Sequence, residues 1–203
     1  MTDHFALLNE TRRPWLDANA LKTRFLALSA QAHPDRVNTA SVEEKEAANR
    51  RFAELNAAYN CLREPKARLQ HLLELELGAK PKDLQQIPPD LADVFVDIAR
   101  LCRDTDEYLI RKAKTSSPLL QAQLFERGQE WTEQLLARQQ DIARRQDTLL
   151  ARLLALDKAW SETPAGSPAR AGLLEELQEL WRLLSFLARW TSQIQERVTR
   201  LVL

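Results

Sequence analysis

The sequence predicts an all-α protein, and three observations support that prediction. Only four of the 203 residues are glycine, well below the usual share of about 7%. Glycine supplies the positive φ angles of hairpin turns and the close backbone approach of phosphate loops, so a sandwich, a barrel, a Rossmann unit or a P-loop is disfavoured. Leucine and alanine, both strong helix formers, are abundant. Apolar residues also recur every three or four positions, the period of an amphipathic helix.

The first 77 residues are expected to hold four helical segments. Their predicted bounds are about 3–8, 18–31, 42–64 and 66–77. Asp17 is a candidate N-cap for the second segment, which ends where a His-Pro pair disfavours helix. Ser41 and Glu44 have the spacing of a capping box before the third segment. Gly78 suits the C-terminal end of the fourth.

Residues 78–90 are rich in proline and lack periodicity, so they are interpreted as a linker between residues 1–77 and 91–203. Three longer helices are expected beyond it, over about 89–114, 118–160 and 168–203. Ser-Pro pairs at 117–118 and 167–168 supply an N-cap and first-turn proline for the last two. The inward residues predicted for the first of these helices are Leu91, Phe95, Ile98, Leu101 and Cys102.

The last helix has the most regular apolar spacing in the chain. Its predicted core positions are Leu173, Leu177, Leu180, Leu184, Leu187, Thr191, Ile194, Val198 and Leu201. Heptad spacing of this length indicates long antiparallel helices packed as an elongated three-helix bundle or coiled coil. That apolar face can be buried within one chain or in a homodimer.

Charge excludes further classes of protein. Lysine plus arginine and aspartate plus glutamate both number 29, and the pI is near 6.9. Nucleic-acid binders show a basic patch, which is absent here, so no nucleic-acid partner is expected. No apolar run approaches the ~20 residues of a membrane span, so we expect a soluble, cytoplasmic protein without a membrane partner.

Cysteine and histidine give no sign of a metal site or a cofactor. Cys61 and Cys102 lie on apolar helix faces without a C-x-x-C pattern, which favours buried small apolar side chains over a disulfide or a metal site. Only three histidines occur, and they are scattered. No nucleophile and second base have a spacing that completes a catalytic site, so no enzymatic activity is expected.

One tripeptide stands apart from the helical pattern: His33-Pro34-Asp35 lies between two antiparallel amphipathic segments. The helical periodicity stops there, which places the three side chains on a solvent-facing loop. Proline stiffens the loop, the aspartate offers two acceptor oxygens suited to an arginine, and the histidine offers a donor and an acceptor. These groups suit docking to another protein.

Over residues 3–77 the sequence resembles the J-domain of DnaJ-type co-chaperones. The tripeptide is followed by Arg36, and the third segment reads FAELNAAYNCL, which fits the family pattern. The stretch LREPKARLQHLLEL more narrowly resembles the HscB (Jac-type) co-chaperones of iron–sulphur cluster assembly. That subfamily also lacks a Gly/Phe-rich linker and carries a C-terminal three-helix domain.

The resemblance implies a mechanism without catalytic residues in this chain. The loop and the second helix dock on a DnaK- or HscA-type chaperone and activate its ATPase, while the C-terminal helices hold a client, the cluster scaffold protein. The chaperone-binding residues implied are Lys22, Arg24, His33, Pro34, Asp35 and Arg36. The client-binding residues implied are Phe95, Val96 and Glu107.

The sequence departs from the family at two surfaces. Leu26, Ala27 and Gln31 stand where the second helix is often basic, and Ala32 replaces an aromatic. Arg100 and Arg103 stand where the client-binding helix is expected to carry acids. Two alternatives therefore remain at this stage: an active J-domain with a different client, or a helical adaptor with a weakened J-domain.

Overall fold

The computed structural model describes residues 2–33, 41–81 and 87–202, and within these ranges it contains helices and no strand. The all-α prediction is confirmed. The chain divides into two compact units, which we describe separately. The first consists of Met1–Lys82 and Leu150–Trp181, and the second of Asp83–Leu149 and Arg182–Leu203. The first unit thus extends beyond the predicted N-terminal region, because it also includes the end of one long helix and the start of the next.

Four helices form the N-terminal part of the first unit. They are α1 (His4–Leu7), α2 (Ala18–Gln31), α3 (Val42–Arg63) and α4 (Pro65–Leu77). The predicted caps are present: Asp17 accepts the Ala20 N–H at 2.7 Å, and Ser41 and Glu44 form both hydrogen bonds of the capping box. Helix α4 ends at Gly78, whose φ of 73° is the left-handed conformation that glycine adopts at low cost.

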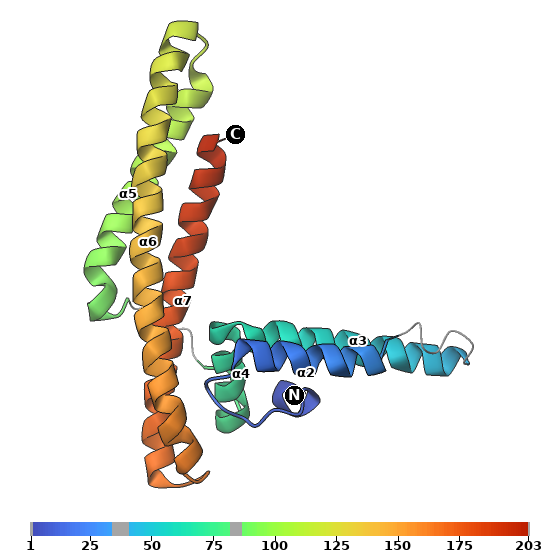
Figure 1. Cartoon of the computed structure of the whole chain (residues 1–203). Coiled ribbons are helices and arrows are strands. Elements are labelled where there is room, and N and C mark those ends of the chain that lie inside the picture. Colours follow the sequence, from blue (N-terminus) through green and yellow to red (C-terminus); the bar gives the residue numbers. More distant parts are fainter. Residues whose placement is uncertain (1, 34–40, 82–86, 203) are drawn as a thin grey trace. The chain divides into compact units, whose positions relative to one another are not determined.

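Helices α2 and α3 run side by side as a hairpin (Figure 1). Their facing apolar residues are almost completely buried: Leu21, Leu55, Ala58 and Leu62 have at most 1% of their surface exposed. Phe25 and Tyr59 extend this contact, with stacked rings whose centroids lie 4.2 Å apart. The two helices of the hairpin therefore share a continuous packed core.

The segment just before α2 joins α4 to the end of α6 (Pro118–Glu162). Arg68 of α4 is only 3% exposed, and its Nε donates to the Pro14 carbonyl at 2.8 Å. Burial lowers the pKa of Arg68 to about 10. On the other side, Asp157 of α6 accepts the Trp15 N–H at 3.1 Å. The Nε1 of Trp160 donates to the Arg12 carbonyl at 2.9 Å.

The turn between α6 and α7 (Pro168–Val202) is closed by an arginine. The Arg170 guanidinium lies over the Trp160 ring, 3.1 Å from its centroid. It also donates to the Trp160 and Thr163 carbonyls at the end of α6. These carbonyls have no partner within α6, so Arg170 performs the capping that a helix C-terminus requires.

The second unit consists of α5 and the remaining parts of α6 and α7 (Figure 1). A 3₁₀ turn over Pro89–Leu91 precedes α5, which spans Ala92–Lys114. The sequence predicts that this helix begins at about Pro89. In the structure residues 89–91 form the 3₁₀ turn, so the α-helix begins three residues later than predicted. Within this unit Ile98, Cys102, Tyr108, Leu135, Ile142 and Ile194 are buried apolar residues.

The predicted core of the long helices is largely correct. Six of the heptad positions on α7 are buried: Leu177, Leu180, Leu184, Leu187, Ile194 and Leu201. Two of the predicted inward residues of α5 are not buried: Leu101 is half-buried, and 38% of the surface of Phe95 remains exposed. Its ring packs at an angle of 35° to that of Trp190, 6.2 Å away, so it lies at the edge of the contact between α5 and α7.

Candidate functional site

The loop between α2 and α3 is the first candidate site. His33 lies directly after α2 and is exposed. Pro34, Asp35 and Arg36 lie outside the described residues, so their roles stay predictions. Helix α2 ends at Gln31 and α3 begins after Ser41. The helices on either side of this stretch thus end and begin where the sequence indicates.

The position of the His33 ring is set by the neighbouring helix. Its centroid lies 5.4 Å from that of Phe52 on α3, with the two planes at 76° to each other. An edge-to-face contact of this kind orients an exposed imidazole without burying it. Phe52 fits the apolar stripe of α3 in the sequence, but nothing in the sequence alone distinguishes its contact with His33 from ordinary core packing.

The two basic residues predicted on α2 differ in their surroundings. Lys22 is exposed and forms no ion pair with any residue that the structure describes. Arg24 lies 3.2 Å from the Glu10 carboxylate and also donates to the Asn9 carbonyl. Leu26 is 54% exposed and Ala27 is exposed, so the outer face of α2 is partly uncharged. Lys22 is therefore the cation on α2 that is available to a partner.

A second candidate site lies on α5, where Val96 and Glu107 are both exposed. They are separated by three helical turns and so lie on the same face of the helix. Arg100 and Arg103 lie between them on this face. Each is close to an aspartate of the same helix, at 3.4 Å from Asp97 for Arg100 and 3.5 Å from Asp104 for Arg103. Phe95 is rotated away from this face toward Trp190.

Trp190 is the residue of this second site that the sequence reasoning missed. It lies outside the heptad stripe of α7, yet it is 3% exposed and contacts both Phe95 and Phe186. The sequence does offer one signal for Trp190: it is one of five tryptophans, and a large aromatic ring outside the main apolar stripe of a helix indicates a second packed face.

Two histidines form a pair at the contact between α1 and α4. The backbone N–H of His4 donates to Nε2 of the His71 ring at 3.0 Å, and the centroids of the two rings are 4.4 Å apart. Burial lowers the pKa of both imidazoles, although the nearby carboxylates of Asp3 and Glu74 act in the opposite direction. A ring that accepts a hydrogen bond at Nε2 is neutral, so this pair stabilises the fold in its uncharged form.

The two cysteines lie outside both candidate sites. Cys61 and Cys102 are free, and Cys102 is buried as predicted while Cys61 is half-buried. Burial raises the pKa of the Cys61 thiol to about 11. Across residues 2–33, 41–81 and 87–202, no group of three or more His, Cys, Asp or Glu side chains is arranged to hold a metal ion. None of the helices in those ranges has the length and hydropathy needed to cross a membrane.

Comparison with known families bears on the first site. Residues 3–71 match the family model of the DnaJ domain. This match covers helices α1 to α3 and the first half of α4, together with the loop that carries the tripeptide. It confirms the resemblance to a J-domain.

Curated relatives narrow the resemblance. A co-chaperone protein HscB homolog of Bordetella petrii is 43% identical over 72 residues, and that of Bordetella pertussis is 40% identical over 72 residues. In both cases the matched part is 36% of this chain and 42% of the relative's own length. The chain thus spans less than half of the curated relatives that it matches.

Solved structures resemble the chain over a longer range. The chaperone HscB from Vibrio cholerae gives a TM-score of 0.58 at 21% identity and is covered to 96%, as is this chain. Human co-chaperone protein HscB gives 0.55 at 20% identity, with 98% of this chain and 81% of the human chain covered. These likenesses show that the fold is of the HscB type, with a J-domain and C-terminal helices.

Proposed function

We propose that this J-domain protein of the HscB type is a cytoplasmic co-chaperone that stimulates ATP hydrolysis by a DnaK- or HscA-type chaperone and delivers an iron–sulphur cluster scaffold protein to it. In this proposal residues 1–77 act on the chaperone, residues 78–90 are a linker and residues 91–203 hold the client. The chain itself is not an enzyme. It needs no nucleotide site or cofactor, because the chemistry belongs to the partner ATPase.

The observation that carries the proposal is the placement of His33, the first residue of the tripeptide. His33 is exposed at the end of the α2–α3 hairpin and is oriented by Phe52, within a segment that matches the DnaJ domain. An exposed, pre-oriented polar group loses little conformational entropy on binding, which favours docking. The charges proposed to steer the encounter are Lys22, Arg24 and Arg36.

Single-turnover ATP hydrolysis by a purified DnaK-type chaperone tests the first half of the proposal. The full chain is expected to raise the rate above the chaperone's own, and Asp35→Asn and His33→Gln are expected to abolish the increase. Asp147→Asn is the matched control, because Asp147 is exposed on α6 and makes no ion pair with a described residue. Equal, negligible stimulation by wild type and Asp35→Asn would instead support the adaptor with a weakened J-domain.

Comparison of two α2 variants sharpens this test. Lys22→Gln is expected to lower stimulation more than Arg24→Gln, because the Arg24 charge is already paired with Glu10. The difference should shrink as ionic strength rises, since exposed charges act through a screened field. Circular dichroism of both variants checks that the helices remain intact.

The client half of the proposal rests on the α5 face with Val96 and Glu107 and on Phe95 beside it. Binding of a purified iron–sulphur scaffold protein to the full chain, measured by calorimetry, is expected to weaken in Val96→Asp and Glu107→Lys. Asp147→Asn again serves as a control. An unchanged affinity in both variants, with ATPase stimulation intact, would favour a different client. Sedimentation equilibrium of the wild type tests the alternative of a homodimer through the C-terminal helices. Such a dimer would need a surface other than the heptad face of α7, because six positions of that face are buried within one chain.

A further inference from the structure

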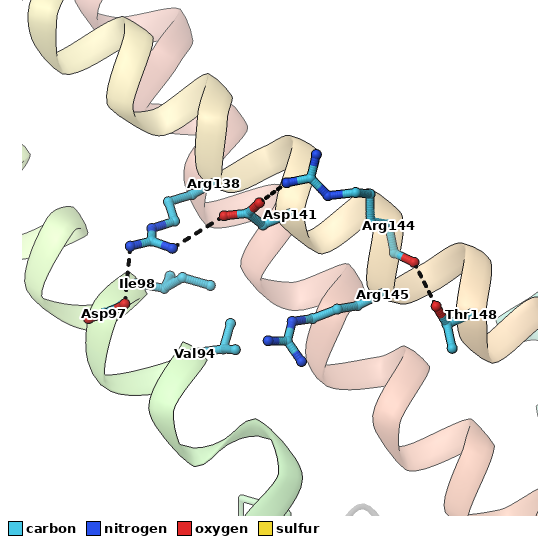
Figure 2. A pocket seen from close by; sticks show the side chains of 8 residues that line it. All are labelled: Val94, Asp97, Ile98, Arg138, Asp141, Arg144, Arg145 and Thr148. Carbon is cyan, nitrogen blue, oxygen red and sulfur yellow. Dashed lines mark hydrogen bonds and ion pairs between the residues drawn. The ribbon is translucent and has the colours of Figure 1, made fainter.

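A cavity of about 400 Å³ lies between α5 and α6 in the second unit (Figure 2). Val94 and Ile98 of α5 form its apolar part. The rest of its lining is Asp97, Arg138, Asp141, Arg144, Arg145 and Thr148. Neither Val96 nor Glu107 lines it, so the cavity is separate from the face of α5 that we assign to the client.

The two carboxylates of the cavity are already neutralised. Arg138 bridges them, with Nη2 at 3.1 Å from Asp97 and Nη1 at 3.2 Å from Asp141. The second oxygen of Asp141 is paired with Arg144, and that of Asp97 lies 3.4 Å from Arg100. Because every carboxylate oxygen faces a cation, these aspartates repel an incoming anion much less than unpaired ones would.

Arg145 differs from the other arginines of the cavity. In the part of the chain that the structure describes, Arg145 takes part in no hydrogen bond or ion pair, although it lines the cavity. Figure 2 shows its guanidinium pointing across the cavity toward Val94. A guanidinium carries five N–H donors in a planar fork that fits a carboxylate with two parallel hydrogen bonds. The lining thus holds one positive charge in excess, beside the half-buried side chain of Val94.

We propose that this cavity binds an acidic side chain of a polypeptide partner. The guanidinium of Arg145 pairs with the carboxylate, and the half-buried side chain of Val94 contacts a neighbouring aliphatic side chain of the same segment. Ile98 is only 1% exposed, so it forms the floor beneath Val94 and does not contact the partner. Charge complementarity selects the partner, because a single excess cation fits one carboxylate. A nucleic-acid backbone instead requires a row of cations, and the two aspartates interrupt such a row. This inference goes beyond the proposed function, because it assigns a second docking surface.

Peptide binding to the full-length protein tests the proposal. The probes are a fluorescein-labelled peptide with one Glu inside a Leu-Leu-Glu-Leu-Leu segment and a twin with Gln in place of Glu. Fluorescence anisotropy gives the affinity, and the methyl NMR signals of Val94 and Ile98 report the location. The Glu peptide is expected to bind about 1.5- to fivefold more tightly than the Gln peptide, the range of an exposed charge pair, because Arg145 is exposed.

Variants of Arg145 test whether its guanidinium is responsible for the preference for Glu. Arg145→Gln is expected to remove the preference for Glu, and Arg145→Lys, which keeps the charge but loses the fork, to retain part of it. Arg111→Gln is the matched control, since Arg111 is an exposed arginine of α5 that does not line the cavity. An undiminished preference in Arg145→Gln overturns the proposal. Methyl signals that stay unperturbed when the Glu peptide binds would also overturn the proposal. The same holds if a labelled single-stranded oligonucleotide binds more tightly than the Glu peptide.

Discussion

The guanidinium of Arg13 and the carboxylate of Asp157, which are 144 residues apart in the sequence, form a two-point ion pair with Nε at 3.0 Å from Oδ1. Asp157 is only 4% exposed, and the same oxygen accepts the Trp15 N–H. This carboxylate therefore holds the segment before α2 against the end of α6 within the first unit. The pairing also raises the pKa of Arg13.

Replacing that carboxylate tests the contact. Asp157→Asn removes the ionic partner of Arg13 and leaves the partly buried donors of Arg13 and Trp15 poorly matched, so the free energy of unfolding is expected to fall by about 1.5–3 kcal/mol. Urea denaturation followed by circular dichroism measures the change. Asp147→Asn, an exposed change on the same helix, should alter stability by less than about 0.5 kcal/mol. Equal effects of the two variants would show that the Arg13–Asp157 contact contributes nothing.

The His4–His71 pair predicts that stability decreases in mild acid. Burial lowers the pKa of both rings below the ordinary value of 6.5, so the unfolded chain takes up protons first as the pH falls. The stability is complete above that pH and is lost as the pH drops from 6.5 through the lowered pKa of the folded state. The urea midpoint of the wild type should therefore be lower at about pH 5.5 than at about pH 8, a range in which ordinary carboxylates stay ionised.

His71→Gln checks the source of that pH dependence. The side-chain oxygen of the glutamine can still accept a hydrogen bond from the backbone N–H of His4, but the side chain does not titrate. The variant is expected to be less stable near neutrality, because the packed ring is lost, and to show a smaller difference between the two pH values. A wild-type midpoint that is the same at both values would contradict the prediction.

The α2–α3 hairpin predicts a large effect of a core truncation. Leu55 is 1% exposed, so Leu55→Ala leaves a cavity and should cost about 2–5 kcal/mol of unfolding free energy. Leu26→Ala removes the same atoms from a side chain that is 54% exposed and should cost less than about 0.5 kcal/mol. A similar cost for the two variants would mean that the hairpin core is not packed as described.

A close approach in the second unit predicts coupling between two residues. The Tyr108 hydroxyl donates to the Leu124 carbonyl, and a Cβ on Gly128 would lie 2.9 Å from the hydroxyl oxygen. Gly128→Ala should therefore lose the gain of about 1 kcal/mol that alanine gives in a helix. In a Tyr108→Phe background the hydroxyl is gone, and the same change should recover about 1 kcal/mol. A double-mutant cycle in urea measures this coupling, and strict additivity would rule it out.

Local signals in the sequence were sufficient to predict most helix ends. Asp17, the Ser41–Glu44 capping box and Gly78 act within one turn of the residues they cap, so their spacing alone predicts the bounds. Pro65 enters α4 at its first position, where its missing N–H costs nothing, one residue earlier than predicted.

Contacts between distant segments could not be predicted in this way. The roles of Arg68 and Asp157 depend on which backbone groups the fold brings to them, and neither residue has a distinctive neighbourhood in the sequence. Phe95 fits the inward-facing stripe of α5 in the sequence, but it packs at the edge of the contact with Trp190 and so remains partly exposed. The sequence could single out His33-Pro34-Asp35 because the helical periodicity stops there, whereas the orientation of His33 by Phe52 required the three-dimensional arrangement.

The contacts around residues 12–15 have a consequence for how this region tolerates sequence change over evolution. Three of them use main-chain atoms, namely the carbonyls of Arg12 and Pro14 and the N–H of Trp15. Every residue type supplies the carbonyls at positions 12 and 14, and every residue type except proline supplies the N–H at position 15, so these bonds only weakly constrain the identity of those residues. The constraint falls instead on Arg68, Asp157 and Trp160, and on Arg13, whose guanidinium pairs with Asp157. Related chains with this architecture should therefore vary at positions 12, 14 and 15 and retain these four side chains.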